Sequence, residues 1–168
     1  RPDDEISGAS ITVGDYTPRN YRGAVYGELT LEEAFARSAN TAAVRLNQEL
    51  DPSRVAKLAR RTGVTIPGAV GAAAPLGAYD IDLLRLTAAY AGLINNCVPV
   101  RPTGLNRIDA SDGCDRLLSR RAHEGLLELL QAGTQPGATG EAAGSTGLPV
   151  GGMGAVVAAL AADQADRR

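Results

Sequence analysis

The sequence has few of the residues that catalytic and metal sites most often use. Its 168 residues include one histidine, two cysteines, no tryptophan and a single lysine, Lys57. One histidine and two cysteines are too few for a structural zinc site, which takes four such ligands. Aromatic residues make up only 4% of the chain. The core must therefore be built from alanine, leucine, valine and isoleucine, and we expect neither a metal nor a cofactor.

The chain also lacks a strong charge of either sign. Lysine and arginine total 17 against 19 aspartates and glutamates, which gives a net charge of -2. Nucleic-acid-binding domains normally carry a clustered basic excess, so we expect no nucleic-acid partner. No run approaches the ~20 apolar residues of a membrane span, and the polar residues 1–5 are unlike a signal peptide. The length suits one domain or part of a larger one, and we interpret the chain as an excised piece or a mature segment.

The first two predicted helices begin at clear capping residues. Thr30 is followed three positions later by Glu33, which is the spacing of a capping box. Apolar side chains then recur at helical spacing as far as Leu46. The second helix begins at Asp51-Pro52, a cap followed by proline at the first helical position, and Gly63 ends it.

Two further helices follow the same logic. Asp80 opens a third helix that continues to about Ile94, where Asn95-Asn96 ends it. Ser119 caps a fourth helix that ends near Gly133. His123 lies inside this last helix and is interpreted as a surface or core residue, because nothing near it in the sequence orients it as a base.

The remaining segments are predicted as loops and short strands. Residues 1–27 are mainly loop, with a short strand possible at 11–13. Between 98 and 118 we expect strands, with a small hairpin near Leu105 to Leu118 that turns at Asp112-Gly113. Residues 134–154 are rich in glycine and alanine and are predicted as loop. The apolar residues 155–162 fit a buried strand or a helical turn, and the sequence does not decide between them.

Several runs in a fixed order resemble the transpeptidase domain of class A, bifunctional penicillin-binding proteins. The resemblance covers residue 6 to about residue 130, and it is carried by 16–23 (Tyr-Thr-Pro-Arg-Asn-Tyr-Arg-Gly), 29–34 (Leu-Thr-Leu-Glu-Glu-Ala), 37–46 (Arg-Ser-Ala-Asn-Thr-Ala-Ala-Val-Arg-Leu) and 75–81 (Pro-Leu-Gly-Ala-Tyr-Asp-Ile). In that family a Ser-x-Asn motif faces the nucleophilic serine across the cleft. The resemblance implies that Ser38 relays protons and that the Asn40 amide holds the substrate. A simpler alternative is that both residues mark a break between helices, because serine and asparagine compete for backbone hydrogen bonds.

The chain departs from the family pattern at its other two motifs. It contains no Ser-x-x-Lys, since Lys57 is preceded three positions earlier by Arg54. Residues 148–154 resemble the approach to the Lys-Thr-Gly strand, yet Met153 stands where lysine is expected, and Ser145-Thr146-Gly147 comes too early. We therefore expect a partial D,D-transpeptidase domain of peptidoglycan cross-linking that is inactive alone. The alternative is a non-catalytic, transpeptidase-like binding or scaffold module.

The resemblance also implies a fold class and a domain layout. The fold class is α+β and predominantly helical: the helical subdomain of the serine β-lactamase / D,D-transpeptidase fold, with a small β-hairpin. Residues 1–168 form one partial domain, with a loop-rich lead-in at 1–27, a helical subdomain with hairpin at 28–133 and a Gly/Ala-rich tail at 134–168.

The same resemblance implies binding partners and a cellular location. The partners are a peptidoglycan stem peptide or a β-lactam in the complete domain. The parent chain is membrane-anchored, lies on the periplasmic or cell-wall side and also carries a family 51 glycosyltransferase. Self-association is expected, because the isolated subdomain exposes surface that a sheet normally covers. An extracytoplasmic address lets a Cys97–Cys114 disulfide persist, and two unpaired, buried thiols are the alternative.

Overall fold

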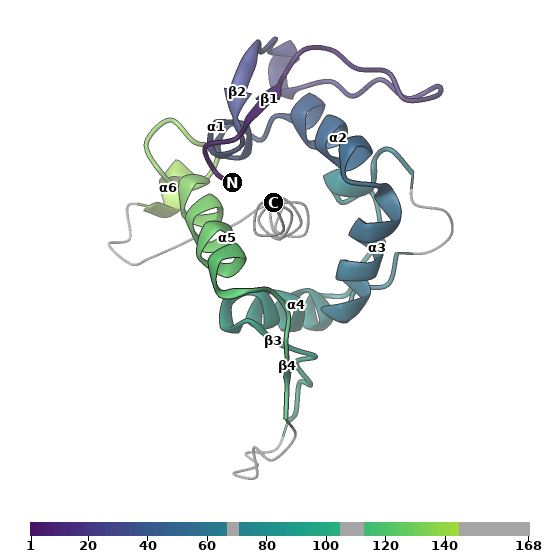
Figure 1. Ribbon diagram of the computed structural model, residues 1–168, viewed down its shortest axis with the longest axis vertical. Coiled ribbons are helices and arrows are strands. Elements are labelled where there is room, and N and C mark those ends of the chain that lie inside the picture. The colour runs from purple at the N-terminus through teal and green to yellow at the C-terminus, as the bar shows by residue number, and fades with distance from the viewer. Residues whose placement is uncertain (67–70, 105–112, 145–168) are drawn as a thin grey trace.

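The computed structural model describes residues 1–66, 71–104 and 113–144, and these residues form a mostly helical structure. In chain order the elements are β1 (Glu5–Ser7), η1 (Tyr21–Gly23), β2 (Glu28–Thr30), α1 (Leu31–Ala36), α2 (Asn40–Glu49), α3 (Pro52–Arg61), η2 (Ala74–Leu76), α4 (Leu83–Asn95), β3 (Cys97–Val98), β4 (Asp115–Arg116), α5 (Arg120–Ala132) and α6 (Glu141–Gly144). Figure 1 shows α1 to α5 following one another around a closed ring, in which α5 returns to pack on α1.

Three of the predicted helix starts are confirmed by their side-chain caps. Thr30 Oγ1 accepts a hydrogen bond from the Glu33 amide, and the Glu33 carboxylate accepts one from the Thr30 amide, each at 3.1 Å. The Asp51 carboxylate accepts from the Ser53 amide at 2.9 Å, at the start of α3. Ser119 Oγ accepts from the amide of Ala122 at the start of α5. These caps depend on residues two or three positions apart, so the sequence alone identifies them.

The predicted starts and segments were wrong in three places. The cap of α4 is Asp82 and not Asp80, because Asp82 Oδ1 accepts from the Arg85 amide at 2.8 Å. Residues 11–13 form no strand, and only an isolated bridge joins Val13 to Tyr16. Residues 141–144 form the short helix α6 inside the predicted loop.

The strands β1 and β2 lie in segments that were not predicted as strands. They pair antiparallel, with Ile6 opposite Leu29. Both side chains are buried, and they form a small core with Ala34, Ala39 and Ala42. The pairing joins residues far apart in the chain, and burial on the helices below stabilises three-residue strands whose local sequence is a weak signal. This ladder holds the start of the chain against α1.

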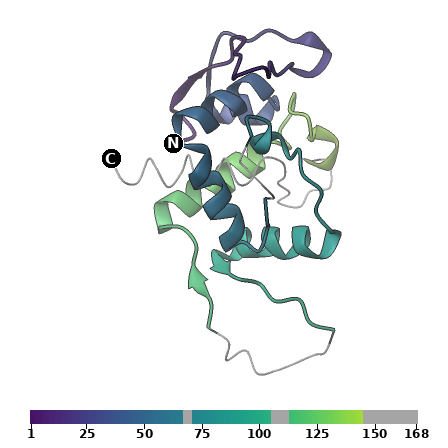
Figure 2. The ribbon, with the colours of Figure 1, turned by 90° about the vertical axis from the view of Figure 1, so that its right-hand side faces the viewer.

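The second ladder contains the disulfide. Cys97 and Val98 in β3 pair with Arg116 and Asp115 in β4. Cys97 and Cys114 form a disulfide, with their Cα atoms 5.2 Å apart. Of the two alternatives, the bridge is therefore confirmed and the pair of unpaired thiols is not. The two arms extend away from the helices (Figure 2). The predicted hairpin began near Leu105, whereas the first strand of the observed ladder is Cys97–Val98. The predicted turn at Asp112 lies outside the described residues.

The larger core lies between α3, α4 and α5. Its fully buried members include Leu93, Leu126 and Leu129, together with Val55 and Val98. The Arg61 guanidinium ties the end of α3 to the carbonyls of Arg116 and Leu117, at 3.0 and 3.1 Å. The strands in the described part have two or three residues each and belong to two separate ladders. The predicted α+β class with a single small hairpin therefore does not describe this arrangement.

Candidate functional site

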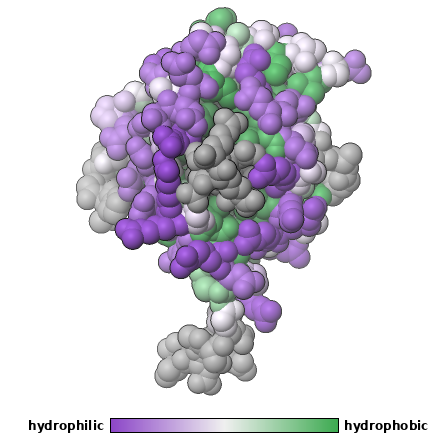
Figure 3. Space-filling model, viewed as in Figure 1, coloured by the Kyte–Doolittle hydropathy of each residue, from purple (hydrophilic) through white to green (hydrophobic). Residues whose placement is uncertain are grey.

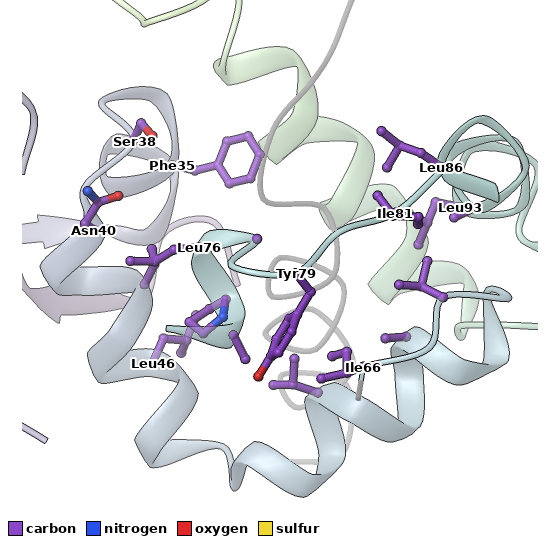
Figure 4. A pocket seen from close by; sticks show the side chains of 18 of the residues that line it. Phe35, Ser38, Asn40, Leu46, Ile66, Leu76, Tyr79, Ile81, Leu86 and Leu93 are labelled. Carbon is purple, nitrogen blue, oxygen red and sulfur yellow. The ribbon is translucent and has the colours of Figure 1, made fainter. Parts of the chain in front are cut away.

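A cavity of about 450 Å³ opens between α1, α2, η2 and α4. Its walls are mainly aliphatic and aromatic: in Figure 4 the side chains of Phe35 from α1, Leu76 from η2 and Tyr79 from the loop after η2 project into it. Ligand sites are typically concave and apolar with a few placed polar groups. This cavity therefore is the candidate site, and its polar groups decide what it can hold.

Ser38 and Asn40 line this cavity at the junction between α1 and α2. The structure therefore brings the two predicted site residues together at a helix break, and both are half-buried. Ser38 has a φ of 51°, in the left-handed region. A side chain in that region costs roughly 1–2 kcal/mol, and backbone strain of this kind often marks functional positions. Nothing in the structure tests the proton-relay role or the substrate-holding role themselves.

The two ends of the Asn40 amide face different surroundings. Its Nδ2 donates to the carbonyl of Arg19 at 2.7 Å. That bond orients the amide, and Figure 4 shows the oxygen of Asn40 on the side of the cavity. The Ser38 side chain lines the same cavity, from the other side of the helix junction. The rim thus offers a fixed acceptor and a hydroxyl that can donate or accept.

The cavity carries little charge. Among its described lining residues only Asp80 is ionisable at neutral pH. Tyr79 adds a phenol, whose oxygen accepts from the Gly71 amide at 3.4 Å. The sequence did not predict Phe35, Tyr79 or Asp80 as site residues, because residue 35 and residues 79–80 are more than forty positions apart and meet only in the fold.

One buried polar side chain was also missed. Asn47 on α2 is fully buried, and neither its oxygen nor its nitrogen has a hydrogen-bond partner among the described residues. An unpaired buried amide costs free energy. It lies one helical turn beyond Ala43, which lines the cavity. The sequence signal for this site was an asparagine at position 47 of a helix whose neighbouring inward positions are apolar.

The other candidates from the sequence lie outside this site. His123 Nε2 is 2.9 Å from the carbonyl oxygen of Leu93, at the end of α4, where it joins two helices. No group of His, Cys, Asp and Glu in the described ranges is arranged to hold a metal. Ser145, Met153 and the apolar stretch 155–162 lie outside the described residues.

The chain resembles penicillin-binding proteins in sequence. It is 28% identical over 127 residues to penicillin-binding protein 1A of Aquifex aeolicus, which is 70% of this chain and 17% of that protein. It is 28% identical over 151 residues to penicillin-binding protein 1F of Bacillus subtilis, which is 80% of this chain and 21% of that protein. The chain thus spans about a fifth of these relatives. No protein-family model matches it.

The fold resembles a solved structure. A crystal structure of a peptidoglycan glycosyltransferase from Burkholderia ambifaria superposes with a TM-score of 0.58, over 83% of this chain and 51% of that one. The sequence identity is 16%, so the comparison shows the fold alone. The chain has a mostly helical fold that resembles this peptidoglycan glycosyltransferase.

This likeness corrects three of the sequence-based predictions. The assignment to a D,D-transpeptidase domain, the assignment to the β-lactamase-like fold and the cross-linking function were wrong, because the matching structure is described as a peptidoglycan glycosyltransferase. The runs at 16–23, 29–34, 37–46 and 75–81 indicated the penicillin-binding proteins, but they did not identify the fold. The chain is thus similar in sequence to penicillin-binding proteins, and its mostly helical fold resembles that of a peptidoglycan glycosyltransferase. None of the helices in the described ranges is both long enough and apolar enough to span a bilayer.

Proposed function

We propose that this chain acts in peptidoglycan synthesis as a relative of the peptidoglycan glycosyltransferase domain of class A penicillin-binding proteins. We further propose that its cavity holds a peptidoglycan strand by the stem peptide. The observation that carries the proposal is that two polar residues, Ser38 and Asn40, line a largely apolar cavity. We also propose that the chain is located outside the cytoplasm, and the Cys97–Cys114 disulfide supports this location.

The chemistry of the cavity suits a short peptide better than a bare sugar. The methyl groups of a stem peptide's alanines are apolar, and so are lining side chains such as those of Leu46 and Leu76. The Asn40 oxygen can accept a peptide N–H, and the Ser38 hydroxyl can pair with a peptide carbonyl. Asp80 at the cavity provides a carboxylate for an amine of the stem. Sugar hydroxyls would instead need many more polar partners than these walls offer.

A holding role fits these residues better than a catalytic one. Glycosyl transfer by acid–base chemistry uses a pair of carboxyl groups. In the described part of the cavity Asp80 is the only carboxylate. We therefore assign substrate positioning, and no bond-making step, to the side chains named here.

The test is co-sedimentation with purified peptidoglycan sacculi. We expect the chain to bind intact sacculi and to lose binding when an amidase has removed the stem peptides. Asn40→Ala should weaken binding about tenfold, which corresponds to the loss of a 1.4 kcal/mol hydrogen bond. Asn95→Ala is the matched control, because Asn95 lies on the exposed end of α4, does not line the cavity, and donates to the Ala91 carbonyl of its own helix. Equal binding to intact and amidase-treated sacculi would reject recognition of the stem peptide.

A further inference from the structure

The cavity between α1, α2, η2 and α4 carries a single charge on its described walls. Hydrophilic residues are spread over the face of the molecule shown in Figure 3, whereas the cavity walls are mostly apolar. Among the described lining residues Asp80 is the only one that ionises at neutral pH, and no arginine or lysine lines this part of the cavity. A positively charged group of a ligand is therefore attracted to the cavity, and an anionic group finds no cation there.

The Asp80 carboxylate has no ion-pair partner among the described residues. The nearest arginine along the chain, Arg85, pairs with Asp82 at 3.2 Å instead. Asp82 Oδ1 also accepts a hydrogen bond from the Arg85 amide, at the start of α4. Asp82 is thus used within the fold, whereas the Asp80 carboxylate is available to a ligand.

The polar groups of the cavity belong to two different walls. Figure 4 shows Ser38 and Asn40 at one edge of the cavity, and Tyr79 and Ile81 well away from them. Asp80 lies between Tyr79 and Ile81 in the chain, in the loop that joins η2 to α4. A ligand that uses both walls must therefore have a hydrogen-bonding backbone and, separated from it by apolar groups, a cation.

We propose that the cavity selects stem peptides whose side-chain amine is free, and that Asp80 determines this selectivity. The inference rests on the proposed function, in which Ser38 and Asn40 hold the backbone of the stem. A free side-chain amine is protonated at neutral pH and can donate to the Asp80 carboxylate. Cross-linking of two stems acylates such an amine and turns it into an uncharged amide. The cavity therefore favours stems that have not been cross-linked through their amine.

The exposure of Asp80 limits the size of this preference. Asp80 is exposed to solvent, and an ion pair between exposed groups strengthens binding by at most about fivefold. Salt weakens such a pair, because the Debye length falls from about 30 Å at 0.01 M to about 3 Å at 1 M ionic strength. Ser38 and Asn40 are uncharged, so their part of the binding depends little on salt. The preference for the free amine is therefore larger at low salt than at high salt.

The experiment is a calorimetric titration of the chain with two soluble disaccharide-peptide fragments of peptidoglycan. The fragments differ only at the side-chain amine of the stem, which is free in one and acetylated in the other. At low salt the wild type should bind the free-amine fragment about threefold to fivefold more tightly. Asp80→Asn keeps the size of the side chain and removes its charge, so it should bind both fragments with the weaker affinity.

Asp82→Asn is the matched control, because Asp82 does not line the cavity and an asparagine can still cap α4. This variant should keep the preference of the wild type. Circular dichroism of both variants checks that the helices are retained.

Equal affinity of the wild type for the two fragments would overturn the proposed selectivity and would leave the holding of the stem peptide intact. A preference that Asp80→Asn retains would also overturn it, and so would one that is unchanged at high salt. Failure of the wild type to bind either fragment would reject the proposed function, and this inference with it.

Discussion

Asn20 and Thr41 form a buried two-way hydrogen-bond pair across 21 positions of the chain. Asn20 Oδ1 accepts from the Thr41 amide at 3.1 Å, and Asn20 Nδ2 donates to Thr41 Oγ1 at 3.2 Å. The Thr41 hydroxyl in turn donates to the Gly8 carbonyl at 2.7 Å. The first turn of α2 has no side-chain cap of its own from Ala39. Asn20 therefore caps this helix from a distant loop and fixes the turn that carries Asn40.

Asn20→Ala is expected to lower the free energy of unfolding by about 1–3 kcal/mol, because it leaves a buried backbone amide of α2 without a partner. Urea denaturation measures this change. Asn95→Ala is the control, and its effect should stay within about 0.5 kcal/mol because that side chain is exposed. Equal effects of the two variants would show that the Asn20–Thr41 pair does not stabilise the fold.

Ser38→Gly is expected to raise stability and to weaken peptide binding together. Glycine removes the cost of a side chain at a φ of 51° and loses some of that gain to its greater freedom in the unfolded chain, so we expect a net gain of about 0.5–1 kcal/mol. Ser38→Ala keeps the strained backbone and removes only the hydroxyl. It should weaken binding without the gain in stability. Thermal melts of both variants measure the change in stability, and co-sedimentation with sacculi measures the change in binding. A destabilised Ser38→Gly variant would contradict the strain.

The Cys97–Cys114 disulfide is expected to contribute about 3 kcal/mol to stability, because it closes a loop with a sequence separation of 17. The double variant Cys97→Ala/Cys114→Ala should lose this contribution, and so should the wild type under dithiothreitol. Denaturation with and without reductant measures both. Unfolding that does not respond to reductant would show that the bridge adds nothing. Adding reductant to the double variant should change nothing, which serves as the control.

Asp51 predicts an acid-dependent step in stability. The backbone amide of Ser53, then its hydroxyl, and then the nearby Arg54 charge lower the pKa of Asp51 below its usual value of 3.8. A carboxyl whose pKa is lower in the folded state contributes stability above its unfolded pKa. That contribution is lost as the pH falls from 3.8 through the folded pKa.

Asp51→Asn keeps an acceptor for the Ser53 amide and removes the titration. The difference in unfolding free energy between wild type and Asp51→Asn should therefore shrink as the pH falls below about 4. Denaturant titrations at several pH values measure this difference. A difference that is the same at neutral and acid pH would contradict the assignment to Asp51.

The sequence predicted those features that depend on neighbouring residues. The Thr30–Glu33 box and the Asp51 cap are local, and both are confirmed. The pairing of Ile6 with Leu29 was missed, because a three-residue strand is defined by its partner far along the chain. The cavity likewise joins α1, η2 and α4, so its members Phe35 and Tyr79 carried no local signal. The resemblance led to the helix junction at Ser38 and Asn40, yet its short matched runs did not specify the fold class, which depends on how distant segments pack.

The most direct test of the central claim is a nuclear magnetic resonance titration of the chain with a soluble disaccharide-peptide fragment of peptidoglycan. Backbone amides of Ser38, Asn40 and Tyr79 should shift with one common dissociation constant, and that of Asp115 in β4, which does not line the cavity, should not. The disaccharide without its peptide should cause no shifts, and Asn40→Ala should raise the dissociation constant about tenfold. Shifts that occur equally with the bare disaccharide, or that avoid the cavity, would contradict the claim that it holds the stem peptide.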